Sequence, residues 1–223
     1  FYPYGEGAAP PAPQQLPDCD YPGKPVLNKT SRIGSIIANR LNAANREFGL
    51  NESGMTDAPM LTVNGASLYL TDGRSATQRA ADHGKPDTVL IDLALDYEKT
   101  SRVAIAAADS CSIAARDAIA GVLQAAGYRV TLLRDIPGLA VMRTVAMLAN
   151  EAADAVNQGV CNAADADLAM QKGVNYPLGP LAWAERIGID RVLRVLQNLG
   201  AEYGEDRYRV SPLIRRKVAS GPG

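Results

Sequence analysis

The chain has 223 residues, of which 47% are hydrophobic and 21% are charged, a composition that excludes a wholly disordered protein. Its 23 Lys and Arg side chains nearly balance its 24 Asp and Glu side chains, so the formal net charge is −1. Such a chain has no long-range positive field to attract a polyanion, and a nucleic-acid partner is not expected.

Compartment signals in the sequence favour a soluble, cytoplasmic protein. No run of about 18 apolar residues occurs and no signal peptide is recognisable, so no membrane contact is expected. The odd number and wide spacing of Cys19, Cys111 and Cys161 favour free thiols in a reducing compartment. With a single histidine, His83, no metal site is predicted. Because residue 1 is Phe and not Met, we expect the sequence to begin inside a longer translated chain.

The N-terminal quarter predicts a linker and one helix. Residues 5–25 are rich in proline and poor in apolar side chains, which favours an extended, poorly packed connector. In residues 28–57, apolar side chains recur at helical spacing over 33–48, after the possible capping residues Thr30 and Ser31. This segment is predicted to be an amphipathic helix and a connector.

Residues 58–134 predict a small α/β domain. Short apolar runs typical of strands occupy residues 61–63, 67–70, 89–93, 103–107 and 130–133. Helical stretches at 75–81 and 112–126 alternate with them, so we expect a mainly parallel sheet covered by helices. Five strands are too few for a full dinucleotide-binding domain.

Residues 135–223 predict an all-α domain. An apolar stripe from Leu139 to Val156 indicates a long helix that ends at Gly159. Three further helices are predicted at residues 163–172, 180–187 and 191–203. Asp190 is the expected N-cap of the last helix, and Asp167, with Asp165, is expected to cap the helix in whose first turn it lies.

Few residues suggest a ligand site. Gly5-Glu6-Gly7 follows no strand and lacks a third glycine, so it is not expected to bind a nucleotide. The turn at residues 71–75 follows a strand and opens a helix, where an anion could bind beside Arg74, although a simple capped turn is more common. His83 is predicted to be an exposed loop residue and not a catalytic base.

Five ordered blocks in the helical part resemble the C-terminal domain of the 3-hydroxyacyl-CoA dehydrogenases. They are Pro-Gly-Leu-Ala-Val-Met-Arg at 137–143, Asn-Glu-Ala at 150–152, Asp-Leu-Ala-Met at 167–170 with Gly173, Pro-Leu-Gly-Pro at 177–180 and Gly-Ile-Asp at 188–190. Residues 208–216 resemble that family's final helix and its approach, and residues 1–4 resemble the tail that closes the same domain. Residues 1–27 would then be the tail of a preceding domain and a linker.

The chain thus resembles the C-terminal portion of the long bacterial members of this family, including those of phenylacetate breakdown, in which a reduced Rossmann-like unit precedes a second helical domain. The resemblance implies that the full enzyme uses NAD to oxidise 3-hydroxyacyl-CoA to 3-oxoacyl-CoA, with 3-hydroxyadipyl-CoA or 3-hydroxybutyryl-CoA as substrate, in phenylacetate or fatty-acid breakdown. It places the NAD site and the catalytic His–Glu pair upstream of Phe1, so we expect no catalytic or cofactor-binding residue in this segment. The family's active-site asparagine position is Met142, which cannot donate a hydrogen bond.

The expected role of the segment is structural. It would pack on a first helical domain or form a homodimer, and help to shape the acyl-CoA groove. The structural or interface candidates are Pro137, Gly138, Met142, Arg143, Pro177, Gly179 and Pro180. The alternative is an independent CoA- or nucleotide-binding α/β module that uses Arg74, Ser75, Ser110 and Ser112 at helix starts after strands.

Overall fold

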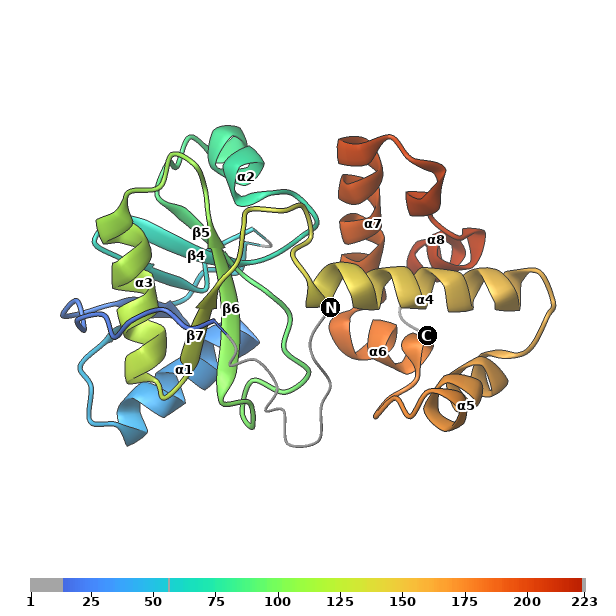
Figure 1. Ribbon diagram of the computed structural model, residues 1–223, viewed down its shortest axis with the longest axis horizontal. Coiled ribbons are helices and arrows are strands. Elements are labelled where there is room, and N and C mark those ends of the chain that lie inside the picture. Colours follow the sequence, from blue (N-terminus) through green and yellow to red (C-terminus); the bar gives the residue numbers. More distant parts are fainter. Residues whose placement is uncertain (1–13, 56, 222–223) are drawn as a thin grey trace, which may run out of the picture.

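The chain folds into an α/β unit followed by an all-helical unit, as a computed structural model that describes residues 14–55 and 57–221 shows (Figure 1). This order confirms the predicted fold class. The expected tail at residues 1–4 and the Gly5-Glu6-Gly7 motif lie outside the described residues.

A seven-stranded sheet forms the centre of the first unit, in the order β2-β1-β3-β4-β5-β6-β7. The strands are β1 (Val26–Asn28), β2 (Gly49–Asn51), β3 (Leu61–Val63), β4 (Ala66–Leu70), β5 (Thr88–Ile91), β6 (Arg102–Ala107) and β7 (Arg129–Leu132). All five predicted strands are confirmed. Two more strands join the sheet: β1 lies at the boundary between the predicted linker (1–27) and the predicted helix and connector (28–57), and β2 lies within the latter. Three-residue strands show too little alternation to be recognised in a sequence.

The prediction of a mainly parallel sheet is wrong. The pairs β1–β2, β4–β5 and β6–β7 are parallel, whereas β1–β3, β3–β4 and β5–β6 are antiparallel. Asn64 and Gly65, with φ of 49° and 86°, form a two-residue turn that makes β3 and β4 a hairpin. No helix separates β5 from β6, so β6 returns beside β5 in the opposite direction.

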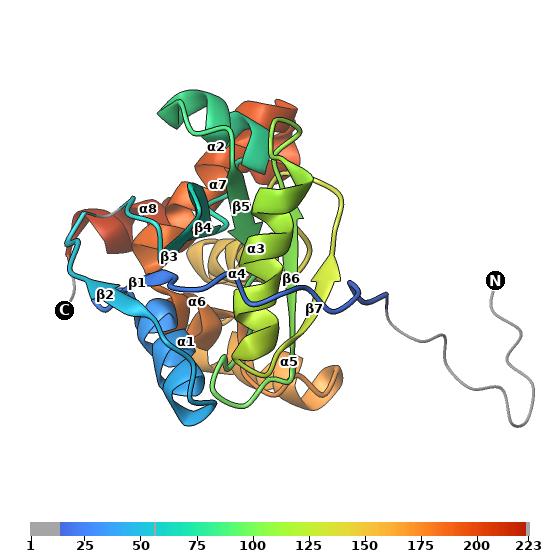
Figure 2. The same ribbon diagram turned by 90° about the vertical axis from the view of Figure 1, so that its left-hand side faces the viewer.

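Helices cover both faces of the sheet. α1 (Arg32–Ala43) and α3 (Ile113–Ala125) pack on one face, toward the viewer in Figure 2, while α2 (Ala76–His83) packs on the other. Ser31 is the N-cap of α1, and its hydroxyl accepts the N–H of Gly34. Alternate residues of the central strands enter the two cores, so Leu68 faces α1 and α3 whereas Tyr69 faces α2.

The described part of the predicted linker, residues 14–25, is extended and is attached to the α/β unit at a few points. The N–H of Leu16 donates to the carbonyl of Val130 on edge strand β7 (2.8 Å), and the N–H of Cys19 donates to Gln124 on α3 (2.8 Å). A Cβ on Gly121 of α3 would lie 2.2 Å from the backbone carbonyl oxygen of Asp20, which belongs to this segment. Residues 14–25 are therefore extended and mostly exposed, as predicted, but Leu16, Cys19 and Tyr21 pack against the core of the α/β unit, so the segment is attached to an edge strand and a helix face.

The second unit contains α4 (Val141–Asn157), α5 (Ala163–Gly173), α6 (Pro180–Ile187), α7 (Ile189–Tyr203), a 3-10 turn (Asp206–Tyr208) and α8 (Pro212–Ala219). The four predicted helices and the final helix that the resemblance implied are confirmed. The N-cap prediction for Asp190 is wrong: Gly188 occupies that position, with φ of 101° and no side-chain capping bond. Among the described residues, none of the helices has both the length and the apolar character that crossing a bilayer requires.

The two aspartates predicted to cap α5 behave differently. Asn162 is the N-cap of α5, and its Oδ1 accepts the N–H of Asp165 (2.9 Å). Asp167 turns away and accepts the N–H groups of the first turn of α6 (2.8 and 3.0 Å), so the prediction that it caps its own helix is wrong. Gly179 makes this contact possible, because a Cβ there would lie 2.2 Å from the Asp167 side chain.

Asp92 joins the longest helix of the second unit to the sheet. It follows β5 directly and is 3% exposed. Its Oδ2 accepts the N–H groups of Ala140 (3.0 Å) and Val141 (2.8 Å), and its Oδ1 accepts that of Met142 (3.0 Å). A carboxylate here satisfies donors that have no partner within the helix and interacts favourably with the helix dipole. One side chain therefore fixes the start of α4 against the sheet.

Replacing Asp92 by Asn is expected to lower the free energy of unfolding by about 1–2 kcal/mol, since an uncharged amide satisfies fewer of the three donors and lacks the charge. Urea unfolding followed by circular dichroism measures the change. Asp109→Asn is the matched control, because Asp109 is exposed. Equal unfolding midpoints for the two variants would contradict the capping role.

Candidate functional site

A cleft of about 470 Å³ lies between the two units at the carboxyl ends of β1 and β4. Asn28 ends β1, Thr71 and Asp72 follow β4, and Arg191 and Arg194 come from the first turns of α7. The strands β1, β2, β4 and β5 run in the same direction. The cleft therefore lies at the sheet edge where open α/β proteins usually bind ligands.

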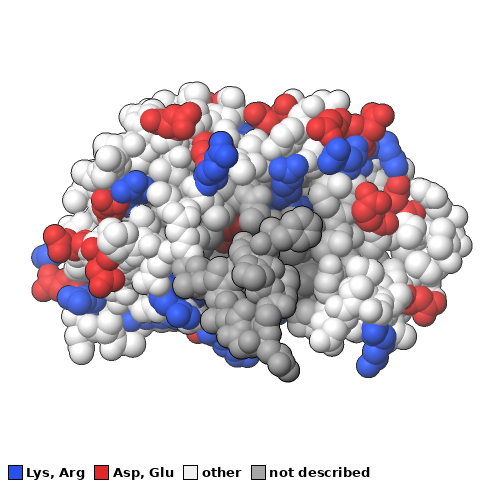
Figure 3. All heavy atoms as spheres, in the orientation of Figure 1, with Lys and Arg blue, Asp and Glu red and all other residues white. Residues whose placement is uncertain are grey.

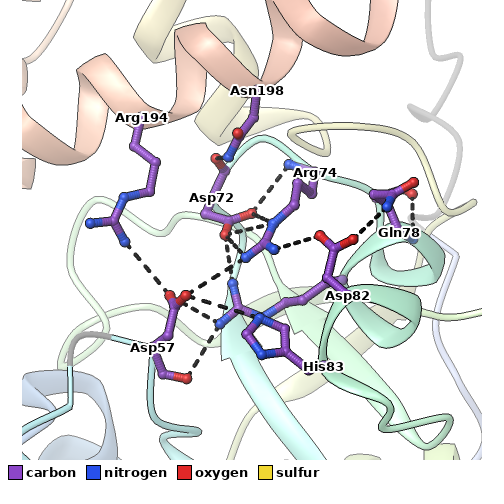
Figure 4. Close-up of polar contacts among 10 residues, drawn as sticks. Asp57, Asp72, Arg74, Gln78, Asp82, His83, Arg194 and Asn198 are labelled. Carbon is purple, nitrogen blue, oxygen red and sulfur yellow. Dashed lines mark hydrogen bonds and ion pairs between the residues drawn. The ribbon is translucent and has the colours of Figure 1, made fainter.

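Several ion-paired side chains of the network drawn in Figure 4 line this cleft. Asp72 accepts hydrogen bonds from Arg74 Nη2 and Arg79 Nη1, both at 2.6 Å. Arg74 Nη1 also donates to Asp82 (2.7 Å), and Arg79 Nη2 lies 3.3 Å from Asp57 Oδ1. Asp72 and Arg79 are 6% and 3% exposed, so this pair is largely removed from water.

Helix α7 contacts the same network. Asn198 Nδ2 donates to the backbone carbonyl of Asp72 (2.8 Å), and Arg194 Nη1 lies 3.6 Å from Asp57 Oδ1. The Arg194 pair is half exposed and contributes little to stability. Gly73, with φ of 101°, lets the backbones meet, because a Cβ there would lie 2.5 Å from the carbonyl oxygen of Val195. This close approach joins the end of β4 to the helical unit.

The electrostatics keep the network charged at neutral pH. Burial by itself raises the pKa of Asp72, but hydrogen bonds from Arg74 and the charges of Arg79 and Arg74 outweigh it and hold the pKa below its ordinary 3.8. Burial lowers the pKa of Arg74, but Asp72 and Asp82 outweigh that effect and raise it. His83 is the last residue of α2 and not a loop residue; its side chain is 35% exposed and 4.0 Å from Asp57.

The alternative of an anion site in the turn at residues 71–75 fails, because the chain itself occupies the donors at the start of α2. Asp135 accepts the N–H groups of Ala76 (2.6 Å) and Thr77 (2.8 Å) at the start of α2. Arg74 is held by Asp72 and Asp82, as described above. The anion-binding interpretation of this turn is therefore wrong, and the capped-turn interpretation is confirmed: Ser75 caps α2 from within the turn, and Asp135 accepts two further N–H groups from a distant part of the chain.

The other side chains considered for a CoA or nucleotide site are also engaged within the chain. Ser75 is the N-cap of α2 and Ser112 that of α3. Ser112 also donates from its N–H to Asp87 (2.9 Å), and Ser110 Oγ donates to the carbonyl of Pro86 (3.0 Å). The structure thus does not bring these serines together with Arg74 into one open site.

The turn after β1 does not fit a dinucleotide. The succession β1, α1, β2 is that of a parallel βαβ unit, where glycines would let a pyrophosphate approach the backbone. Here Asn28 fills the turn: its Oδ1 accepts the N–H and hydroxyl of Thr30 (3.0 and 2.7 Å), and its Nδ2 donates to Ser53 (3.1 Å). Of the glycine contacts expected in such a βαβ unit, the turn keeps the close approach of helix to strand at Gly34, where a Cβ would lie 2.4 Å from the Asn28 carbonyl oxygen.

The structural candidates at the start of α4 lie inside the helical unit. Met142 is fully buried in its core. Arg143 hydrogen-bonds the hydroxyls of Tyr203 (3.1 Å) and Tyr208, and its guanidinium lies 4.7 Å from the Tyr203 ring centre. Gly138, with φ of 74°, packs against α7. Pro137, which precedes it, is half-buried.

The candidates before α6 form a tight entry to that helix. Pro180 occupies the first turn, where its missing N–H costs nothing, and Gly179 packs on Asp167. Pro177 is exposed. The ring centres of Tyr176 and Trp183 lie 5.8 Å apart, and Trp183 is 7% exposed, so its ring is largely packed within the protein.

Two family descriptions match adjacent parts of the chain. Residues 68–137 match the 3-hydroxybutyryl-CoA dehydrogenase reduced Rossmann-fold domain, and residues 138–222 match the 3-hydroxyacyl-CoA dehydrogenase C-terminal domain. The chain belongs to the 3-hydroxyacyl-CoA dehydrogenase family. The boundary between the two matches falls between β7 and α4, where the sheet gives way to helices.

The relatives of known name are much longer than the part of them that this chain matches. The 3-hydroxyadipyl-CoA dehydrogenase of Escherichia coli K12 is 42% identical over 156 residues, which are 70% of this chain and 32% of that protein. A probable 3-hydroxybutyryl-CoA dehydrogenase of Deinococcus radiodurans is 39% identical over 39% of this chain and 31% of its own length. The match thus spans about a third of these two dehydrogenases.

A solved structure supports the same alignment. The crystal structure of 3-hydroxybutyryl-CoA dehydrogenase from Escherichia coli K12 has a TM-score of 0.69 and 38% identity, and covers 75% of this chain and 34% of that one. The enzyme from Ralstonia eutropha, at 22% identity and a TM-score of 0.61, shows the same fold.

Sequence patterns missed the residues that matter most at the junction of the two units. Asp92 lies within the apolar run at 89–93 and Asp72 follows the run at 67–70 by two residues, so a charged residue at the end of a buried strand was the available signal. Asp57 and Arg79 carried no such signal, because their partners lie on other elements. Within residues 14–55 and 57–221, no group of three or more His, Cys, Asp or Glu side chains could hold a metal ion.

Replacing Asp72 by Asn leaves Arg79 buried without its full counter-charge, so we expect the free energy of unfolding to fall by about 3 kcal/mol at neutral pH. Because the pKa of Asp72 is lower in the folded than in the unfolded chain, its stabilisation is present above the ordinary pKa and is lost as the pH falls through the folded pKa.

The unfolding free energy of the natural chain should therefore decline more steeply than that of the variant between about pH 5 and pH 2. Chemical denaturation at a series of pH values measures both curves. Asp82→Asn, which alters the exposed partner of Arg74, is the control and should cost under about 1 kcal/mol. Parallel pH curves for the natural chain and Asp72→Asn would contradict the assignment.

Proposed function

We propose that this chain is the non-catalytic C-terminal portion of an NAD-dependent 3-hydroxyacyl-CoA dehydrogenase, whose full enzyme oxidises 3-hydroxyacyl-CoA to 3-oxoacyl-CoA. The main support for this proposal is the burial of Met142. This residue takes the position of the active-site asparagine that the family resemblance implies, and it is fully buried in the helical core. A thioether donates no hydrogen bond and suits irregular packing, so this position contributes packing and not substrate contact.

In this proposal NAD and the catalytic His–Glu pair belong to another part of a longer protein, and this segment binds neither NAD nor a metal. The turn at Asn28, which does not fit a pyrophosphate, supports that assignment. The proposed substrate, 3-hydroxyadipyl-CoA or 3-hydroxybutyryl-CoA, follows the names of the relatives. The proposal places its oxidation in phenylacetate or fatty-acid breakdown in the cytoplasm, as the sequence resemblance and the free cysteines suggest. Acidic and basic side chains are intermixed over the face seen in Figure 3, which suits a role without nucleic acid.

We further propose that residues 135–223 pack on a first helical domain or form a homodimer contact, and so help to shape the acyl-CoA groove. Apolar side chains that stand exposed on and beside α4 and α5 support this role: Val141, Val160, Leu168 and Val174 are 39%, 74%, 51% and 54% exposed. Residues 58–134 hold the helical unit in place through Asp72 and Asp92. Arg143 acts within the chain, by fixing α4 to Tyr203 and Tyr208.

The isolated chain is expected to show no turnover. Protein whose intact mass is near 23.6 kDa should produce no NADH above the enzyme-free rate with either 3-hydroxybutyryl-CoA or 3-hydroxyadipyl-CoA, because the proposal places hydride transfer elsewhere. Absorbance of NADH measures the rate. Steady turnover at that mass, abolished by heat treatment of the sample, would overturn the proposal.

In the full enzyme, Met142→Asn is expected to leave kcat/KM within about twofold of the natural value, since Met142 contacts no reacting group. The same change should lower the unfolding free energy of the chain by about 1–3 kcal/mol, because a buried amide gains no partner. Met147→Asn, on the same helix but half-buried, controls for the loss of a methionine. A large fall in kcat with an unchanged Tm would count against a silent position.

A further inference from the structure

The cleft between the two units has an apolar extension. A groove of about 280 Å³ adjoins it. Apolar side chains line most of it, among them Ile36, Leu93, Leu95, Trp183 and Ile187, and the charged residues Asp96 and Arg186, one of each sign, also line it. Both cavities share Arg32, Ile33, Leu70 and Arg191 in their walls. They are therefore the polar and apolar ends of one cleft, with two arginines where the ends meet.

The charges at the polar end leave one positive charge unbalanced. The charged residues that line it are Arg32, Arg79, Arg191, Arg194, Asp57, Asp72 and Asp190. Arg79 pairs with Asp72 and Arg194 with Asp57. Arg32 and Arg191 form no ion pair with another described residue, and Asp190 is the one acidic side chain left to oppose them. The polar end therefore suits a ligand with a single negative charge better than one with two or more.

An independent observation also points to a ligand at this end. Thr71 is 1% exposed and lines the cleft, yet its hydroxyl has no hydrogen-bond partner among the described atoms. The same holds for Nε of Arg79, a residue that is 3% exposed. Buried polar groups of folded proteins are nearly always hydrogen-bonded. A ligand oxygen at the polar end would supply the missing partner.

We propose that this cleft binds a carboxylate with an unbranched apolar tail. The carboxylate lies at the polar end, between Arg32 and Arg191 and within reach of Thr71, and the tail follows the groove past Leu93 to Trp183. Binding needs neither NAD nor the oxidation reaction, so this site is separate from the proposed function. The two arginines of this site, Arg32 and Arg191, are different from Arg74, which is ion-paired with Asp72 and Asp82.

The single tryptophan of the sequence lies in the groove wall, so its fluorescence reports on the tail. The 223-residue chain is titrated with octanoate, with 1-octanol and with octyl phosphate. We expect a saturable change with octanoate, binding of 1-octanol weaker by about tenfold or more, and octyl phosphate bound no more tightly than octanoate. No saturable change, equal binding of 1-octanol, or tighter binding of octyl phosphate would overturn the proposal.

Two variants locate the carboxylate. Arg191→Gln should weaken octanoate by about tenfold and leave 1-octanol unchanged, because it removes one charge-assisted bond. Thr71→Val keeps the side-chain volume and should weaken octanoate while leaving the Tm no lower. Arg215→Gln, an exposed arginine on α8 outside the cleft, is the matched control and should have no effect. An unchanged octanoate affinity in Arg191→Gln would overturn the assignment.

Calorimetry on a longer protein that contains this chain completes the test. Octanoate should bind there with similar affinity. Loss of binding would mean that another part of the protein covers the cleft, and would overturn the proposal. Neither the fluorescence titration nor the calorimetry depends on turnover. A failure to bind octanoate would therefore leave the dehydrogenase assignment untouched.

Discussion

The buried carboxylate of Asp92 at the end of β5 is the contact on which the rest of the arrangement depends. A carboxylate removed from water needs strong donors, and the first N–H groups of a helix need acceptors that the helix itself cannot provide. Joining the two satisfies both requirements at once and fixes the start of α4. Asp72 performs a related task at the end of β4, where its carboxylate holds two arginines and its backbone meets α7.

These contacts also explain why the sheet edge differs from a nucleotide site. Helix starts beside the carboxyl ends of strands are places where phosphates commonly bind. In this chain, Asp135 occupies the start of α2 and Asn28 fills the turn before α1. The chain therefore satisfies with its own side chains the donors that a nucleotide would otherwise meet.

The helical unit shows the same preference for internal contacts. Met142 packs in the core and Arg143 lies against two tyrosine rings, so the motif at the start of α4 stabilises the unit from within. The cleft beside α7 is different, because Arg32, Arg191 and the hydroxyl of Thr71 have no ion-pair or hydrogen-bond partner among the described residues. Structural and ligand-binding roles therefore fall on neighbouring but separate groups of residues.

The sequence by itself determined the elements whose signal is local. Apolar periodicity located five strands and the helices from α1 to α7, and ordered motifs identified the family of the helical part. It could not reveal β1 and β2, because three residues carry too little pattern, nor the direction of β6, which depends on where the chain returns.

The tertiary structure alone decided the partners of the charged groups. Asp92 is 48 residues from Ala140, and Asp135 is 59 residues from Ala76. A charged side chain is compatible locally with many partners, and only the packing of distant elements selects one of them and leaves Arg32 and Arg191 facing a cleft.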